Sequence, residues 1–245
     1  MLNRRSLVLG LSGACLATSV KALNDTWEAL LTDAITTSNP VTLGRIMLPK
    51  DSPLWQQAQD QLDAAAKQKV PYRIAKYFVT SLPAQFQTAW PEPDKAHPTV
   101  ANPLIVLFFL STGLKPAGDT TPWCSAFLNW CLQHASPSFD GTKDAGSQSF
   151  IQNNWGEEVW HRGDIWPPKN AGRGDVAVFT EKSDPAHGHV AFFDGPTPGQ
   201  PDHIDVLGGN QFNKAGLHTF SVKSLNIHAG LELASIRTAE GLRNV

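Results

Sequence analysis

Three strand patterns in close succession constrain the fold of this chain more than any other feature. They cover residues 175–180, 189–194 and 203–207, and each alternates β-branched or aromatic residues with other types. The connection at 195–202 holds three prolines and two glycines, so we expect a tight turn and an antiparallel return. A helical pattern at 124–134 precedes these strands. A helix followed by an antiparallel meander is typical of an α+β fold.

The composition fits one globular domain of ordinary size with a helical appendage. A chain of 245 residues can bury a full core, and a 41% apolar fraction excludes wholesale disorder. The formal charge of −2 argues against a nucleic-acid partner, because such partners select clustered lysine and arginine. No apolar run approaches the roughly 18 residues that a transmembrane helix needs.

Residues 1–22 have the features of a signal peptide. Arg4 and Arg5 form a positively charged start, an apolar stretch with small residues follows, and a small-residue cleavage site ends at Ala22. The paired arginines also resemble a twin-arginine signal, and an ordinary first helix is the alternative. We therefore predict a periplasmic or secreted protein. Removal of the segment would leave 17 basic and 22 acidic residues, a net charge of −5.

The rest of the chain divides into a helical N-terminal region, residues 23–98, and a second region, residues 99–245. Helical patterns cover 27–37, 54–69 and 72–82, with Ser52 as the expected N-cap of the second and Pro71 as its expected end. Residues 91–98 carry three prolines and predict a connection between the two regions.

Cysteine usage points to a reactive thiol. Cys124 and Cys131 remain after removal of Cys15 with the signal peptide. Seven residues apart on a helix, their Cα atoms should lie roughly 10 Å apart, too far for a disulfide. Cys124 opens the helix, where backbone N–H groups lower a thiol pKa and can bind a developing oxyanion. We interpret Cys124 as a candidate nucleophile and Cys131 as a core residue. Asp119 and Thr121, just upstream, are interpreted as caps of the helix, with lining of the cleft as the alternative.

A nucleophilic cysteine needs a base, and the base needs a residue that orients it. His189 opens the second strand pattern and is the candidate base. If Asp194 pairs with residue 203, position 189 lies opposite 208, or opposite 209–210 after a slip of one or two residues. This register favours Asn210, or less strongly Gln211, as the orienting residue, and places Asp205 opposite residue 192, away from the site. Asn210 could instead be a left-handed turn residue after two glycines.

Four motifs in this order resemble the CHAP family (cysteine, histidine-dependent amidohydrolases/peptidases) and its NlpC-type relatives. They are TPWCSAFLNWC, GRGDVAVF, GHVAFFDG and VLGGNQ, and the resemblance covers roughly residues 102–213. It implies a papain-like fold and a thiol amidase or endopeptidase that cuts amide bonds in the peptides of peptidoglycan, without metal or other cofactor. Cys124 matches the family's nucleophile, His189 its base and Asn210 the Asn form of its third residue. The Glu that some members carry two residues before this Asn is Gly208 here.

Two other functions compete with this interpretation. His187 and His189 form an H-x-H pair that could bind zinc, with Asp184, His203 and Asp205 near in sequence, although no HExxH motif occurs. Alternatively, a non-catalytic wall- or glycan-binding module could use the tryptophans of the loop-rich segment, which are Trp155, Trp160 and Trp166. Anchoring of loops is the more ordinary role for these three rings.

Overall fold

The computed structural model describes residues 48, 52–90, 101–116 and 118–243, all of which belong to one compact unit that spans residues 39–245. The predicted signal peptide (1–22), the first predicted helix (27–37) and the proline-rich connection (91–98) lie outside the described residues. Within them, no helix has the length and apolar character that a membrane span requires.

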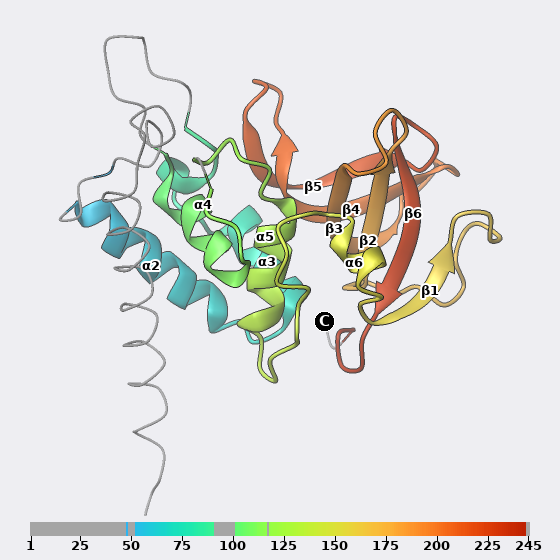
Figure 1. Ribbon diagram of the computed structural model, residues 1–245, viewed down its shortest axis with the longest axis horizontal. Coiled ribbons are helices and arrows are strands. Elements are labelled where there is room, and N and C mark those ends of the chain that lie inside the picture. Colours follow the sequence, from blue (N-terminus) through green and yellow to red (C-terminus); the bar gives the residue numbers. More distant parts are fainter. Residues whose placement is uncertain (1–47, 49–51, 91–100, 117, 244–245) are drawn as a thin grey trace, which may run out of the picture. The chain divides into compact units, whose positions relative to one another are not determined.

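Short helices precede a single antiparallel sheet in the chain (Figure 1). The helices are α2 (Pro53–Ala66), α3 (Pro71–Thr80), η1 (Ala84–Phe86), α4 (Pro103–Phe108), η2 (Phe109–Ser111), α5 (Cys124–Gln133) and α6 (Ser149–Gln152). The strands are β1 (Glu157–His161), β2 (Val176–Glu181), β3 (Gly188–Pro196), β4 (His203–Phe212), β5 (His218–Asn226) and β6 (Leu231–Thr238).

The α+β class predicted from the sequence is confirmed. The sheet has six strands in the order β1-β6-β2-β3-β4-β5, and the three predicted strands are its centre, β2 to β4. The flanking strands β1, β5 and β6 carry no clear prediction from the sequence. Much of β1 and β5 is exposed, so these strands lack the apolar alternation that marks the central ones.

Helices α2 and α3 begin where the sequence predicts. The Ser52 hydroxyl accepts a hydrogen bond from the Leu54 N–H at 3.4 Å, and Pro53 occupies the first turn. The helix ends at Ala66, three residues before the predicted end, and Lys69 adopts a left-handed φ of 64°. Pro71 has a role that the sequence analysis did not assign, because it is a first-turn residue of α3.

Helices α3, α4 and α5 share an aromatic core with one face of the sheet. Phe78 of α3 lies at its centre and stacks on Phe220 of β5 at 5.3 Å between ring centroids. Other rings in edge contact with Phe78 come from α4 and α5, namely Phe108, Phe127 and Trp130. The predicted N-terminal helical region therefore supports the cysteine-bearing helix directly.

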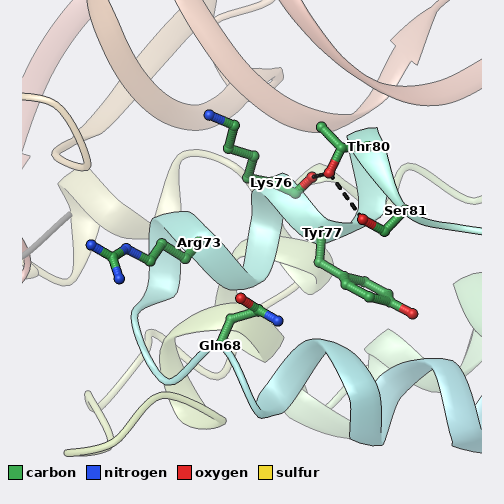
Figure 2. Close-up of a pocket in the computed structure, with 6 residues that line it drawn as sticks. All are labelled: Gln68, Arg73, Lys76, Tyr77, Thr80 and Ser81. Carbon is green, nitrogen blue, oxygen red and sulfur yellow. Dashed lines mark hydrogen bonds between the residues drawn. The ribbon is translucent and has the colours of Figure 1, made fainter.

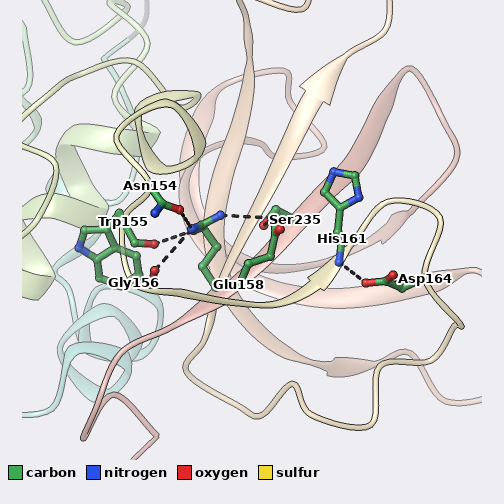
Figure 3. Close-up of polar contacts among 8 residues, drawn as sticks. Asn154, Trp155, Gly156, Glu158, His161, Asp164 and Ser235 are labelled. Carbon is green, nitrogen blue, oxygen red and sulfur yellow. Dashed lines mark hydrogen bonds and ion pairs between the residues drawn. The ribbon is translucent and has the colours of Figure 1, made fainter.

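The opposite face of the sheet has its own apolar cluster, in which β2, β3, β4 and β6 all take part. At its margin, Arg237 of β6 is 3% exposed and holds the segment before β1. Its guanidinium donates to the Trp155 carbonyl at 2.5 Å and to Asn154 Oδ1 at 2.7 Å, and it pairs with Glu158 at 3.3 Å. Figure 3 shows these groups converging, with Ser235 bonded to the same carboxylate.

Candidate active site

Helix α5 carries Cys124 into the core of the unit. Every residue from Cys124 to Leu132 is buried, and Pro122 and Trp123 precede the first turn. Trp123 stands at the N-cap and makes no side-chain cap hydrogen bond, and the first N–H groups of α5, those of Cys124 and Ser125, act on the Cys124 thiol. The predicted cap, Asp119, does not have this role: its carboxylate accepts from the backbone N–H groups of Trp90 and Asn102.

The site lies where β3 and β4 part. Their pairing runs only from Phe192 opposite Leu207 to Pro196 opposite Ile204, although both strands continue beyond Phe192 and Leu207. The observed register therefore lies two to three residues from the starting assumption of the sequence analysis, and Asp205 pairs with Gly195 rather than with residue 192. Continued from Phe192, the register places residue 210 level with His189, which is the two-residue slip considered above.

The parting of the strands leaves a backbone N–H group free to face Cys124. Hydrogen-bonding groups of successive strand residues point to opposite sides. Since the N–H of Phe193 bonds to the Asp175 carbonyl on the β2 side, the N–H of Val190 points toward β4. No β4 residue pairs with Val190, and its N–H acts on the Cys124 thiol, whose pKa it lowers.

A bulge in β4 brings two side chains to this place. The register between β4 and β5 shifts between Gly208 and Gln211, and Asn210 within the bulge has a φ of 60°. Asn210 is therefore a left-handed residue, as the alternative in the sequence analysis held, and its side chain also lowers the pKa of the Cys124 thiol. Gln211, rather than Asn210, contacts His189, with 3.4 Å between its Nε2 and the ring Nε2.

Two glycines before the bulge allow the close approach of neighbouring groups. A Cβ at Gly209 would lie 2.1 Å from the Trp123 ring, and one at Gly208 would lie 2.8 Å from the Ala191 Cβ and 2.9 Å from Gln211 Nε2. Side chains at these two positions would displace Trp123 beside the nucleophile and Gln211 beside the base. The Gly-Gly pair thus sets the packing of both.

Burial keeps the Cys124 thiol protonated in the free protein. Desolvation raises its pKa, and the N–H groups of Val190, Ser125 and Cys124 and the amide of Asn210 oppose this effect only in part. Cys131, two turns later, is fully buried and its pKa is raised well above the usual value by burial. The two thiols therefore differ in that only Cys124 faces donors from the sheet.

His189 is a buried, neutral imidazole. It is 7% exposed, its ring lies 6.3 Å from that of Phe179, and burial together with the charge of Lys223 lowers its pKa to about 4. Among the described residues, no hydrogen bond joins His189 to Cys124 or to Asn210. Neighbouring residues of β4 thus serve different groups, Asn210 the Cys124 thiol of α5 and Gln211 the His189 ring of β3.

His218 of β5 completes the surroundings of Asn210 and was not identified from the sequence. Burial lowers the pKa of its ring, and the Asn210 carbonyl opposes this effect only in part, so the ring is neutral at pH 7. Within the described part of the chain, His218 Nδ1 and Asn210 Oδ1 are buried without a hydrogen-bond partner.

The residues of the two competing interpretations have other contacts. His187 bonds to Asp184 at 2.7 Å on the surface, and the described residues contain no group of three His, Cys, Asp or Glu side chains that could hold a metal ion. The indole N–H groups of Trp155 and Trp166 bond to the carbonyls of Asp140 and Pro201, while Trp160 is buried.

A polar cavity of about 310 Å³ lies apart from these residues, next to α3. Its lining residues, shown in Figure 2, are Gln68, Arg73, Lys76, Tyr77, Thr80 and Ser81. None of the candidate site residues lines it.

We expect His189 to make the stability of the fold depend on pH. Its pKa of about 4 lies below the ordinary value of 6.5, so the unfolded chain binds more protons between these limits. The contribution of His189 to the free energy of unfolding should therefore be fully present above pH 6.5. It should fall by about 3 kcal/mol as the pH drops to 4. Urea unfolding of the wild type and of His189→Gln at pH 7 and pH 4 measures this. An equal loss in both proteins would contradict it.

Comparison with known protein families and structures gives one match. The family model for the CHAP domain matches residues 116–210, a segment that runs from just before α5 to Asn210 in β4. It includes Cys124, His189 and Asn210. No curated protein and no solved structure matches the chain.

Proposed function

We propose, from the match of residues 116–210 to the CHAP domain model, that this protein is an exported cysteine peptidase or amidase that cleaves amide bonds in peptidoglycan peptides. The observation that carries the proposal is the placement of Cys124. It opens a buried helix, inside the matched segment, at the point where β3 and β4 part and present His189, Val190 and Asn210. A papain-like fold is part of the same proposal.

The chemistry begins from a neutral pair. His189 accepts the proton of the Cys124 thiol as the sulfur attacks the scissile carbonyl carbon, because neither group is charged beforehand. The Val190 N–H and the Asn210 amide stabilise the negative charge on sulfur as it forms. The carbonyl oxygen of the tetrahedral intermediate is bound by the N–H groups at the start of α5.

The second half of the reaction returns the protein to its first state. His189 gives its proton to the leaving amine, the C–N bond breaks, and a thioester remains on Cys124. Water then attacks the thioester while His189 takes one of its protons. The acid leaves, the proton returns to sulfur, and one water molecule has been consumed for each amide bond cut.

The place of action is the cell wall in this proposal. Residues 1–22 would direct export to the periplasm or the medium, where peptidoglycan is reached without crossing a membrane. Expression of the full chain with fractionation and N-terminal sequencing of the product tests this part. A product that begins at Leu23 in the periplasmic or secreted fraction is expected, and an uncleaved cytoplasmic product would contradict it.

Mass spectrometry of purified muropeptides after digestion tests the activity and identifies the bond. We expect products that together gain the mass of one water per cleavage, with Cys124→Ala inactive and Cys131→Ala active. Activity that survives EDTA and is lost to a thiol alkylator agrees with the thiol mechanism. Protein that sediments with cell walls but releases no amine would instead favour the binding-module alternative.

A further inference from the structure

The side chain of Gln211 occupies the position next to the base that the sequence analysis gave to Asn210. Its Nε2 lies 3.4 Å from Nε2 of His189, and its Oε1 accepts from the Ser221 hydroxyl at 2.5 Å. The glutamine is 4% exposed. A buried amide held at both ends has few other positions to adopt.

The backbone explains why Gln211 reaches His189 and its neighbour does not. The left-handed residue Asn210 turns the strand, so that residues 210 and 211 serve different partners, Cys124 and His189. Gly208 leaves room for the amide, since a Cβ there would stand 2.9 Å from Gln211 Nε2. Ser221 is set by regular pairing, because it lies opposite Gly208 on β5.

We propose that Gln211, oriented by Ser221, is the positioning residue that selects the ring tautomer of His189 in which Nδ1 can act as the base. The catalytic role of Gln211 rests on the proposed function. Its contacts with His189 and Ser221 are independent of that function. In the structure the NH₂ group of Gln211 faces Nε2. The proposed tautomer therefore requires the amide to turn so that its oxygen faces Nε2–H, which leaves Nδ1 to receive a proton from Cys124.

The amide has two orientations with different consequences. When its NH₂ group faces His189, it donates to Nε2, the ring proton stays on Nδ1, and Nδ1 is no base. When its oxygen faces His189, it accepts from Nε2–H, and Nδ1 carries the lone pair. A serine hydroxyl both donates and accepts, so Ser221 satisfies either orientation. The second orientation also suits the imidazolium formed during the reaction, which needs an acceptor at Nε2.

The charged and titratable groups around His189 do not select its ring tautomer. Lys223 on β5 adds a positive charge that lowers the pKa of His189, and the Phe179 ring on β2 is apolar. Cys124 on α5 is neutral through burial. In the described residues, the Gln211 amide is the hydrogen-bonding partner of the ring.

Three variants of the full chain test the proposal. Gln211→Leu should lower kcat by about 100-fold with little change in KM, and Ser221→Ala by about 10-fold, because the ring is no longer held in the reactive tautomer. Gln211→Glu offers only acceptor oxygens, so it should keep kcat within about 10-fold of the wild type and raise the pKa of His189 by about 1 to 3 units. Gln133→Leu, which loses a 3.1 Å bond to the Ser111 carbonyl at the far end of α5, is the matched control.

NMR of the ¹⁵N- and ¹³C-labelled ring gives a readout that needs no substrate. The Nε2–H tautomer is expected in Gln211→Glu and should be lost in Gln211→Leu. An unchanged tautomer and pKa across the variants, or wild-type kcat in folded Gln211→Leu, would overturn the proposal. If Cys124→Ala remained active, the proposed function would fail, while the ring signals would still decide whether Gln211 sets the tautomer.

Discussion

Replacing Cys124 with alanine is expected to lower kcat/KM on muropeptides by about 10⁴-fold while the fold remains intact. The sulfur is the atom that bonds to the substrate carbon, and the structure provides no other nucleophile between the parted ends of β3 and β4 among the described residues. Removal of one small buried sulfur should cost only about 1 kcal/mol of stability. Steady-state kinetics and thermal unfolding of the same preparation measure the two effects.

Cys131→Ala is the matched control because both cysteines are buried on the same helix. It removes the same atom seven residues later, where the described structure shows no contact with β3 or β4 donors. Its activity should match that of the wild type within about twofold. If both variants lost activity to the same extent, damage to α5 rather than loss of the nucleophile would be the explanation.

The central fold could be predicted because its signals are local. Alternation of apolar residues marked β2, β3 and β4, and the cap residue Ser52 marked the start of α2. The outer strands could not be predicted, because half-exposed strands such as β5 carry a weak pattern whose pairing depends on the rest of the sheet. Strand β6 is different, because it is mostly buried and lies between β1 and β2, a place in the sheet that its position in the sequence does not indicate.

The candidate site was predicted only as far as residue types and a regular register allow. Cys124 and His189 follow from their places at the starts of a helix and a strand. The division of roles between Asn210 and Gln211 does not, because it depends on a bulge and on a φ of 60° that appear only in three dimensions. Sequence arithmetic assumes straight strands, and at this site β4 bends away from β3.

Replacing His189 with glutamine is expected to lower kcat/KM by about 10³-fold, since the substituted amide cannot take the thiol proton. The loss should be larger than for Gln211→Leu, which removes orientation but keeps the base. In the wild type, kcat/KM should hold from neutral pH down to about pH 5 and fall as His189 is protonated, with its pKa of about 4. A pH series of kcat/KM measures this limb.

The acid limb of the pH dependence of kcat/KM shows whether His189 or His218, the second histidine near the site, is the base. His218 is also neutral at pH 7, but it faces the Asn210 backbone, whereas the Asn210 side chain acts on the thiol. His218→Gln should therefore retain more activity than His189→Gln and keep the acid limb in place. If the acid limb of kcat/KM shifted in pH in His218→Gln, His218 would be the base. A His189→Gln variant as active as the wild type would lead to the same conclusion. In that case Asn210, which contacts both Cys124 and His218, would link the nucleophile to it.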